Sequence, residues 1–406
     1  MTGVVEENSQ IRGTMTRAGR SSPLLLTQFS MRQPAYRTDQ RRALDWLEQI
    51  HAESHATHES PCAAEGAAFR ARLHAAIERC ACGPTKIGTR GHVIPDVGRT
   101  DWGDLPIYDV TSHPSGKGTA ARSRFFAKTV DAYFETEYEH DDLAPGEIVH
   151  VTCTGYVSPS GAQRVVQHKS WGDLTRVIHA YHMGCYAALP AVRIAAGCLS
   201  LSEGLSASGV DRRVDIVHTE LCSLHLDPGD HSIEQLVIQS LFADGFIRYS
   251  MCENDRAPGL RVLALDERIL PHSSDSMSWM VSDRGMQMTL ARDVPDRVAG
   301  CLRQFVSDLY EKAGLALGEH HSRTVFAVHP GGPKIIDRVR QVLELTDVQV
   351  QTSRDVLFDH GNMSSATLPH IWMRLAADEG VAPGTLVASL AFGPGLTVCG
   401  GLFRKQ

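Results

Sequence analysis

The chain has 406 residues, of which 42% are hydrophobic and 21% charged, and its net charge is −7 at neutral pH. This composition indicates a globular protein with one large or two medium cores and excludes fibrous and disordered classes. The acidic balance makes nucleic acid an unexpected partner. No apolar run is long enough to predict a membrane span, and the polar start MTGVVEENSQ lacks the features of a signal peptide. We therefore expect a cytoplasmic protein without a membrane partner.

The first half of the chain alternates between expected strands and helices. Residues 1–22 are polar without an apolar period, so we expect a flexible arm. SSPLLLTQF then predicts a strand, and RTDQRRALDWLEQIHAE predicts an amphipathic helix. The alternating run Ile148 to Val151 predicts a strand that ends in a loop rich in Gly, Ser and Pro. An Ala-rich stretch suited to a buried helix follows, and VDIVHTELCSL predicts another strand.

The second half continues in the same way. VAGCLRQFVSDLYEKAG predicts a helix, TVFAVHPGG a strand, and PKIIDRVRQVLEL and GNMSSATLPHIWMRLAADEG two further helices. LVASLAFGPGLTVCGGLF predicts a terminal strand pair that is broken by glycine. We expect a layered α/β fold with a flexible arm at 1–22, an N-terminal half at 23–250 and a C-terminal half at 251–406.

Among the ten cysteines, Cys185 is the candidate nucleophile because it follows Met183-Gly184 and directly precedes the Ala-rich helix. A glycine turn that opens a helix places unpaired backbone N–H groups and the positive helix end beside the thiol, which favours a thiolate nucleophile. A cysteine is more often a buried inert thiol, and the neighbouring motifs are what favour a chemical role here. Cys153, at the end of an earlier strand, is the weaker rival nucleophile.

A histidine and an asparagine complete the expected site. In AVHPGGPK, His329 ends a predicted strand, and in DHGNMSSATLP, Asn362 stands before two small hydroxyl residues at a predicted helix start. Alone, the histidine would be structural and the asparagine a helix cap. Together with Cys185 they suit acyl transfer, because a thiolate accepts an acyl group while imidazole and amide N–H groups stabilise an enolate or oxyanion.

These segments resemble a known family. GCYAALPAVRIAAG, AVHPGGPKI, GNMSSATL and FGPGLTV look like the nucleophile, histidine, asparagine and C-terminal glycine-loop motifs of the chalcone synthase-like type III polyketide synthases. The resemblance covers about Leu24 to Phe403. It implies the five-layered αβαβα thiolase fold built from two similar halves, a homodimer, no metal or other cofactor, and catalysis by Cys185, His329 and Asn362.

Two segments depart from the plant-type pattern. HVTCTGYVSPSGAQ and VHTELCSLHLDP look similar to bacterial stand-alone ketosynthases that join two β-ketoacyl chains and close an α-pyrone ring in the myxopyronin and corallopyronin antibiotic pathways. The resemblance implies that residues of these segments and of the glycine loop line the substrate pocket: Cys153, Thr154, Glu220, Cys222, His225, Gly393, Pro394 and Gly395. For Cys222 and His225, a satisfied buried strand is an equally good interpretation. If Glu220 lies on an interior strand, it should meet a hydrogen-bonding partner.

The sequence contains no convincing metal site. Cys80 and Cys82 form a CxC pair without a second ligand pair at zinc-site spacing. His51, His55 and His58 share one face of a polar helix, where we expect solvated side chains.

The leading hypothesis is a Claisen-type condensation of two β-ketoacyl thioesters, delivered by acyl carrier protein or by coenzyme A, through an acyl group on Cys185. An iterative type III synthase that extends an acyl starter with malonyl-coenzyme A is the alternative, since decarboxylation and deprotonation give similar enolates. A third hypothesis is a silent acyl-binding subunit, which the intact Cys185, His329 and Asn362 disfavour.

Overall fold

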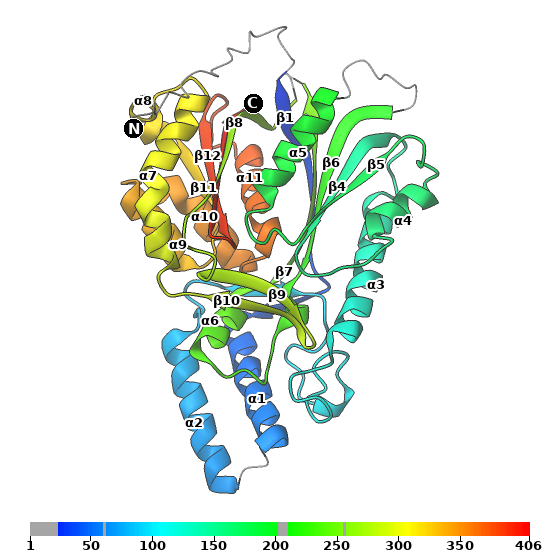
Figure 1. Ribbon diagram of the computed structural model, residues 1–406, viewed down its shortest axis with the longest axis vertical. Coiled ribbons are helices and arrows are strands. Elements are labelled where there is room, and N and C mark those ends of the chain that lie inside the picture. Colours follow the sequence, from blue (N-terminus) through cyan, green and yellow to red (C-terminus); the bar gives the residue numbers. More distant parts are fainter. Residues whose placement is uncertain (1–22, 60–61, 202–209, 255–256) are drawn as a thin grey trace, which may run out of the picture.

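The computed structural model describes residues 23–59, 62–201, 210–254 and 257–406. These residues form a mixed α/β fold in which helices cover both faces of one large sheet (Figure 1). The predicted layered α/β architecture is therefore confirmed. The expected arm, residues 1–22, lies outside the described residues.

The large sheet has the strand order β11-β12-β13-β8-β1-β7-β6-β4-β5. On one side of the seam between β1 and β8, β7 is antiparallel to both β1 and β6, and β4 is parallel to β6. On the other side, β13 is antiparallel to both β8 and β12, and β11 is parallel to β12. The strands are β1 Leu24–Arg32, β4 Ala144–Thr152, β5 Arg176–Tyr181, β6 Val210–Leu221, β7 Asp244–Glu253, β8 Leu260–Ile269, β11 Val325–Val328, β12 Leu386–Gly393 and β13 Thr397–Lys405.

The same succession of strand directions thus runs outward from both sides of the seam over four strands, and β5 is an additional strand on one side. This repetition supports the division of the chain into two halves, which we retain as a proposal. Because β7 continues to Glu253 and β8 begins at Leu260, we set the proposed boundary in the connection between them and not at residue 250.

Three apolar clusters hold the layers together. The inner cluster contains α5 (Ala188–Leu201) and α11 (Thr367–Ala377), with strands from both sides of the sheet. The second packs α1 (Gln40–Glu59), α3 (Thr119–Glu137) and α4 (Gly161–His168) against β4, β6 and β7. The third packs α7 (Val294–Lys312), α9 (Pro333–Val342) and α10 (Asp347–His360) against β11, β12 and β13.

The strands separate these clusters because successive side chains point to opposite faces. In β4, Val149 and Val151 belong to the inner cluster, whereas Ile148 belongs to the second. The result is five layers. Outer helices cover the half of the sheet that contains β4, β6 and β7, the inner helices α5 and α11 lie in the middle, and the half that contains β11, β12 and β13 is covered by the other outer helices. The Ala-rich segment predicted as a buried helix is α5, where small side chains permit close packing between the two sheet sides.

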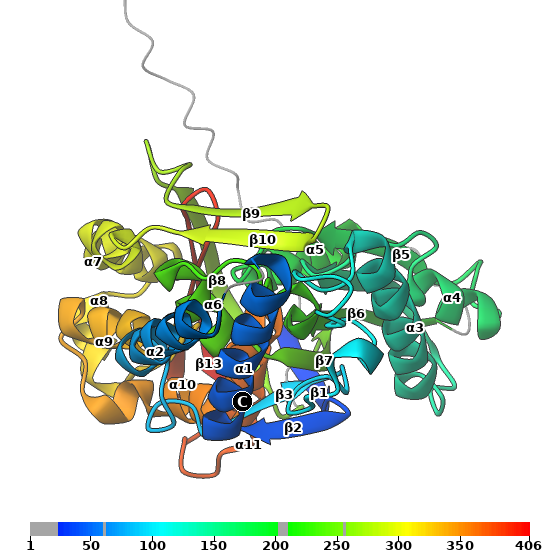
Figure 2. The ribbon, with the colours of Figure 1, turned by 90° about the horizontal axis from the view of Figure 1, so that it is seen from below.

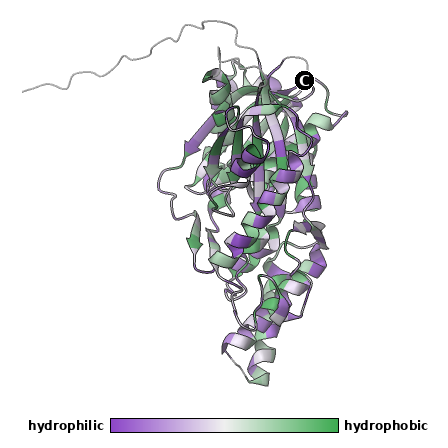
Figure 3. Cartoon of the chain, turned by 90° about the vertical axis from the view of Figure 1, so that its right-hand side faces the viewer, coloured by the Kyte–Doolittle hydropathy of each residue, from purple (hydrophilic) through white to green (hydrophobic). Residues whose placement is uncertain are grey.

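Helices α1 and α2 (Ala63–Cys80) project from one end of the body, with α6 (Ile233–Leu241) at their base (Figures 1 and 2). Hydrophilic and hydrophobic residues alternate along this projection (Figure 3), and α2 buries only Leu73 and Ile77. A hairpin of β9 (Met277–Ser282) and β10 (Gly285–Leu290) packs on α6. The remaining elements are β2 Tyr36–Asp39, β3 Thr89–His92 and α8 Leu317–His320.

The prediction that the histidines of α1 are solvated is wrong for His51. Its ring is fully buried, and its two nitrogens lie 2.9 Å from a ring nitrogen of His231 and 3.0 Å from the Gln239 side-chain oxygen. Burial lowers the pKa of His51 to about 4, so this ring is a neutral packing element between α1 and α6. Within the described residues, no helix is both long and apolar enough to span a membrane.

Candidate active site

Cys185 lies in a glycine turn between β5 and α5. Gly184 has a φ of +81°, and a Cβ atom there would lie 2.8 Å from a ring carbon of Pro394. Both the conformation and the close approach require glycine at this position. The turn closes with a hydrogen bond from the Ala187 N–H to the Gly184 carbonyl, and α5 begins at Ala188. Cys185 therefore stands just before a helix start, as predicted.

The expectation that this position favours a thiolate is wrong for the free protein. The Cys185 side chain is only 8% exposed, and burial raises the pKa of its thiol to about 12. Removing water disfavours the charged form more than the nearby backbone groups favour it. The only side-chain hydroxyl near its sulfur within the described residues is Ser364 Oγ, at 3.8 Å. The resting thiol is neutral, so acyl transfer needs a group that accepts its proton.

His329 follows directly after β11, and its backbone N–H donates to the Leu390 carbonyl at 2.8 Å. The ring is buried, and neither ring nitrogen has a hydrogen-bond partner among the described residues. Burial lowers the pKa of His329 to about 3. A neutral imidazole without a competing partner has one nitrogen that can accept a proton and one N–H that can donate.

Asn362 is held by its backbone and by its side-chain oxygen. Its N–H donates to the Leu241 carbonyl at 3.0 Å, and its own carbonyl accepts from the Ala243 N–H at 2.8 Å. The side-chain oxygen accepts from the Ser364 N–H at 2.9 Å and from the Thr367 hydroxyl at 3.4 Å. This network assigns oxygen and nitrogen in the amide and leaves the NH₂ group to donate elsewhere. Asn362 is not the cap of α11, because the residue before that helix is Ala366.

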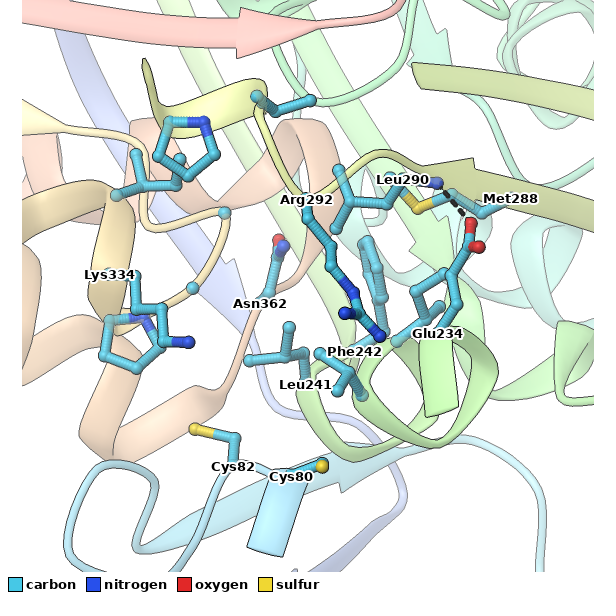
Figure 4. Close-up of a pocket in the computed structure, with 18 of the residues that line it drawn as sticks. Cys80, Cys82, Glu234, Leu241, Phe242, Met288, Leu290, Arg292, Lys334 and Asn362 are labelled. Atoms are coloured by element: carbon cyan, nitrogen blue, oxygen red, sulfur yellow. Dashed lines mark hydrogen bonds between the residues drawn. The ribbon is translucent and has the colours of Figure 1, made fainter. Parts of the chain in front are cut away.

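One cavity of about 870 Å³ brings the three predicted catalytic residues together. Cys185, His329 and Asn362 all contribute to its wall, although they come from segments up to 177 residues apart in the chain. Figure 4 shows Asn362 between Lys334 on one side and Arg292 on the other. Much of the remaining wall is apolar, formed by Leu241, Phe242, Met277, Met288, Leu290 and Phe392. A cavity with this lining suits an acyl chain with a reactive carbonyl at the polar end.

Four exposed cations line the cavity and were not identified from the sequence: Arg79, Lys86, Arg292 and Lys334. None of them forms an ion pair with another described residue, whereas many other arginines of the protein do. They belong to α2, the loop after it, the connection between β10 and α7, and α9, so no local sequence pattern could have grouped them. Unpaired cations at a cavity attract anionic groups.

The cavity also exposes two thiols at its wall, Cys80 and Cys82. Burial raises the pKa of Cys82 to about 11. In the described part of the chain, no group of three or more histidines, cysteines and acids has the arrangement of a metal site.

Four of the predicted pocket residues form a buried polar cluster behind Cys185. Glu220 is fully buried and accepts from the Cys153 N–H at 3.0 Å, from the Thr154 hydroxyl at 3.1 Å and from the Ser365 hydroxyl. The expectation that Glu220 has hydrogen-bonding partners is confirmed. Burial raises its pKa, while these donors oppose the shift. Cys222 is also buried, in the turn Cys222–His225 that follows β6.

Ser364 connects this cluster to the nucleophile. Its hydroxyl lies 3.0 Å from the Cys153 sulfur and 3.8 Å from the Cys185 sulfur. The sequence showed Ser364 only as one of two small hydroxyl residues after Asn362, without a role. The 870 Å³ cavity is not lined by any of the four residues of this cluster, Cys153, Thr154, Glu220 and Cys222. Their contact with substrate stays a prediction.

His225 and the glycine loop also lie outside the cavity wall. His225 sits in a 3₁₀ turn and not on a strand, and its ring contacts the Thr154 carbonyl at 2.8 Å and the Met286 N–H at 3.1 Å. A Cβ atom on Gly393 would lie 2.3 Å from the Tyr186 ring. The Gly393-Pro394-Gly395 loop therefore packs against the Cys185 turn and positions it.

Parts of the sequence are similar to known proteins. Residues 262–405 match the family described as chalcone and stilbene synthases, C-terminal domain. A putative chalcone synthase of Bacillus subtilis is 29% identical over 55% of this chain and 60% of its own length. The matched region is thus less than two thirds of that relative. A 1,3,6,8-tetrahydroxynaphthalene synthase of Streptomyces coelicolor is 27% identical over 72% of this chain and 76% of its own.

Solved structures share the fold over nearly the whole chain. The C-terminal type III polyketide synthase domain of Steely1 from Dictyostelium has a TM-score of 0.75 and 23% identity, covering 94% of this chain and 99% of its own. The structure of the Streptomyces coelicolor tetrahydroxynaphthalene synthase has a TM-score of 0.73 and 24% identity, covering 94% and 99%. The predicted thiolase fold is confirmed. The chain is therefore similar to chalcone and stilbene synthases in residues 262–405, and it shares the fold of type III polyketide synthases.

Proposed function

We propose that the protein is an acyltransferase that forms a carbon–carbon bond between two acyl thioesters through an acyl group on Cys185. The observation that carries the proposal is the meeting of Cys185, His329 and Asn362 in one largely apolar cavity. A nucleophilic sulfur, a proton acceptor and an amide donor are the groups that a Claisen-type condensation requires.

The first step transfers an acyl group to the enzyme. The Cys185 sulfur attacks the carbonyl carbon of the first thioester while its proton moves to His329. The bond between that carbon and the carrier sulfur then breaks, and the departing thiolate takes the proton from His329. Amide and imidazole N–H groups donate to the carbonyl oxygen as its negative charge develops. The products are acylated Cys185 and a free carrier thiol.

The second step forms the new bond. The α-carbon of a β-ketoacyl thioester loses a proton to His329, and Asn362 donates to the enolate oxygen. The carbanion attacks the acyl carbon on Cys185, whose sulfur leaves and recovers the proton from His329. In the alternative reaction, malonyl thioester loses carbon dioxide to give the enolate, so no base is needed to form it. An enol oxygen that attacks the remaining thioester carbonyl would close an α-pyrone and release the second carrier thiol.

The finer assignment is α-pyrone formation from two β-ketoacyl chains in antibiotic biosynthesis. It is supported by the likeness of the segments that carry Cys153 and Glu220, and the alternative is an iterative synthase that uses malonyl-coenzyme A. The four unpaired cations at the cavity support a donor with phosphate groups, which both coenzyme A and the phosphopantetheine of an acyl carrier protein supply. The proposal includes a homodimer and a cytoplasmic location, where a nucleophilic thiol stays reduced.

The test is to incubate the purified protein with a β-ketoacyl thioester, with and without malonyl-coenzyme A, and to follow intact mass, products and carbon dioxide. Cys82→Ala is the matched control for Cys185→Ala, because both thiols line the same cavity. We expect an adduct and a pyrone from two input chains in the wild type and in Cys82→Ala, and neither in Cys185→Ala. Product formed only with malonyl-coenzyme A would support the iterative synthase. No Cys185-dependent adduct with any acyl donor would refute the proposal.

A further inference from the structure

The backbone of Asn362 is bonded to the chain just after α6. Its N–H donates to the Leu241 carbonyl at 3.0 Å, and its carbonyl accepts from the Ala243 N–H at 2.8 Å. These two bonds form a parallel bridge between Phe242 and Asn362. Because α6 ends at Leu241 and β7 begins at Asp244, the bridge rests on a connection of two residues. The place of the Asn362 amide therefore depends on how firmly this connection is held.

Two side chains hold the end of α6 and the connection after it. The last carbonyl groups of a helix have no partner within the helix and need donors from elsewhere. Here the Ser240 carbonyl accepts from the Gln40 side chain at 2.9 Å, and the Gln239 carbonyl accepts from the Arg90 side chain at 2.7 Å. Arg90 also donates to the Phe242 carbonyl at 2.9 Å. One guanidinium thus joins the helix end to the connection that carries the catalytic amide.

The Arg90 side chain, which extends from β3, is itself held on two sides. Its Nε donates to the side-chain oxygen of Gln40, a fully buried residue, at 2.8 Å. Its aliphatic part packs against Gly361, the residue before Asn362, where a Cβ atom would lie 3.0 Å from the Arg90 Cγ. Its charge lies at the negative end of the α6 dipole, where a cation is stabilising. Arginine suits this position because one planar group can donate to three acceptors in different directions.

From this geometry we infer that Arg90 is a positioning residue for Asn362. The inference rests on the proposed function and adds a residue that acts on the same site from outside, since Arg90 does not line the 870 Å³ cavity. Arg90 contacts both sides of the bridge, the Phe242 carbonyl on one and Gly361 on the other. It therefore sets the direction in which the Asn362 amide donates to the enolate oxygen.

The test is a double-mutant cycle on the second step of the reaction. Cys185 is first acylated with an acyl-coenzyme A until intact mass shows that each variant is loaded. The β-ketoacyl or malonyl thioester that the wild type uses is then added, and the rate at which the acyl group leaves Cys185 in the product is measured. Arg90→Lys keeps the charge but loses the planar group that reaches three acceptors. It is compared with the wild type, Asn362→Ala and the double variant.

Arg122→Lys is the matched control. Arg122 is buried, and its guanidinium also donates to main-chain carbonyls, which belong to Ser115, Lys117, Leu224 and Leu226. None of these four residues belongs to α6 or to the connection after it. Both substitutions should lower the thermal unfolding temperature, but only the one at Arg90 should be coupled to the Asn362 amide.

We expect Arg90→Lys to slow the second step at least about tenfold in the wild-type background, because a misplacement of about 1 Å can cost about 100-fold. In the Asn362→Ala background the same change should slow it less than about twofold, since the group that Arg90 positions is absent. Arg122→Lys should change the rate by the same factor in both backgrounds. A wild-type rate in folded Arg90→Lys, or equal factors for it in both backgrounds, would overturn the inference.

A second variant covers the case in which Arg90→Lys does not fold. Gln40→Met removes the acceptor that orients the guanidinium and keeps the length of the side chain. It takes the place of Arg90→Lys in the same cycle, and equal factors in both backgrounds overturn the inference there as well. Absence of any Cys185 adduct in the wild type would instead overturn the proposed function itself.

Discussion

The charge state of Cys185 gives the sharpest test of the roles assigned to Cys185 and His329. Burial raises the pKa of the Cys185 thiol to about 12 and lowers that of His329 to about 3, so neither group carries a charge alone at neutral pH. Opposite charges in one cavity compensate each other, and a thiolate can form there when its proton passes to the ring. We predict that His329→Gln, which cannot accept this proton, keeps Cys185 in its unreactive thiol form.

The magnitude follows from the pKa. A thiol with a pKa of about 12 is ionised to only about one part in 10⁵ at pH 7, whereas an ordinary cysteine with a pKa of about 8.5 is ionised to a few per cent. The rate of Cys185 alkylation by iodoacetamide at pH 7 should fall by at least about 100-fold in His329→Gln. In this variant the rate should also keep rising with pH beyond pH 10.

Alkylation is followed by mass spectrometry of the peptide that contains Cys185, in the Cys82→Ala background so that a second cavity thiol does not react. Thermal unfolding shows whether each variant is folded. If Cys185 in folded His329→Gln alkylates at the wild-type rate, or titrates near the ordinary cysteine value, the proton does not pass to His329 and the assigned role is wrong.

Three further predictions concern stability, the nucleophile turn and the anion site. Burial lowers the pKa of five histidines to about 3, below the value in the unfolded chain: His150, His218, His225, His329 and His370. Stability is therefore complete above about pH 6.5 and falls toward pH 3, by roughly 1 kcal/mol per pH unit for each ring that stays neutral in the folded protein; urea unfolding between pH 7 and 5 checks this, and a flat profile contradicts it. Gly184→Ala should cost about 1–3 kcal/mol and most of the acylation rate, because φ is +81° and the new methyl group meets Pro394, and wild-type behaviour in both assays would show that the turn tolerates a side chain. Lys86→Ala with Lys334→Ala should raise the KM for an acyl-coenzyme A about tenfold and weaken its salt dependence, while Lys128→Ala, an exposed lysine of α3 outside the cavity, should change neither; equal KM values would remove these lysines from the anion site.

What the sequence predicted well was local. Gly184 before Cys185 and the strand before His329 are contiguous patterns, and each produced the expected turn or strand end. The helix expected at Asn362 begins later, because a 3₁₀ turn precedes α11, which starts at Thr367. The strand of β1, the helix α1 and the terminal strand pair also follow directly from hydrophobic periodicity.

What it could not predict depends on distant segments that meet only in the fold. The high pKa of Cys185 comes from burial by many elements, whereas the expected low value considered only the adjacent helix. His51 is buried because α6 packs on α1, and the polar sequence of α1 gives no sign of that neighbour. Trp279 is one apolar residue of a short strand in the sequence, and only the fold brings its N–H to the carbonyl of Cys153, 126 residues away.

The buried ring of His329 is costly for a structural residue. A buried polar atom without a partner typically costs about 1–3 kcal/mol of stability, and both ring nitrogens lack one among the described residues. Folding alone would favour a partner or an apolar side chain here, whereas Glu220, in the buried polar cluster behind Cys185, satisfies its oxygens with several donors. The difference between His329 and Glu220 has a chemical reason. A condensation needs a neutral imidazole whose nitrogens are not hydrogen-bonded to the protein, and a space from which water is excluded. Water would hydrolyse the acyl group on Cys185 and protonate the carbanion before it could attack. In the proposed reaction, the thiol proton and the thioester oxygen are the missing partners of this ring, so the protein gives up stability at His329 for the step that the substrate completes.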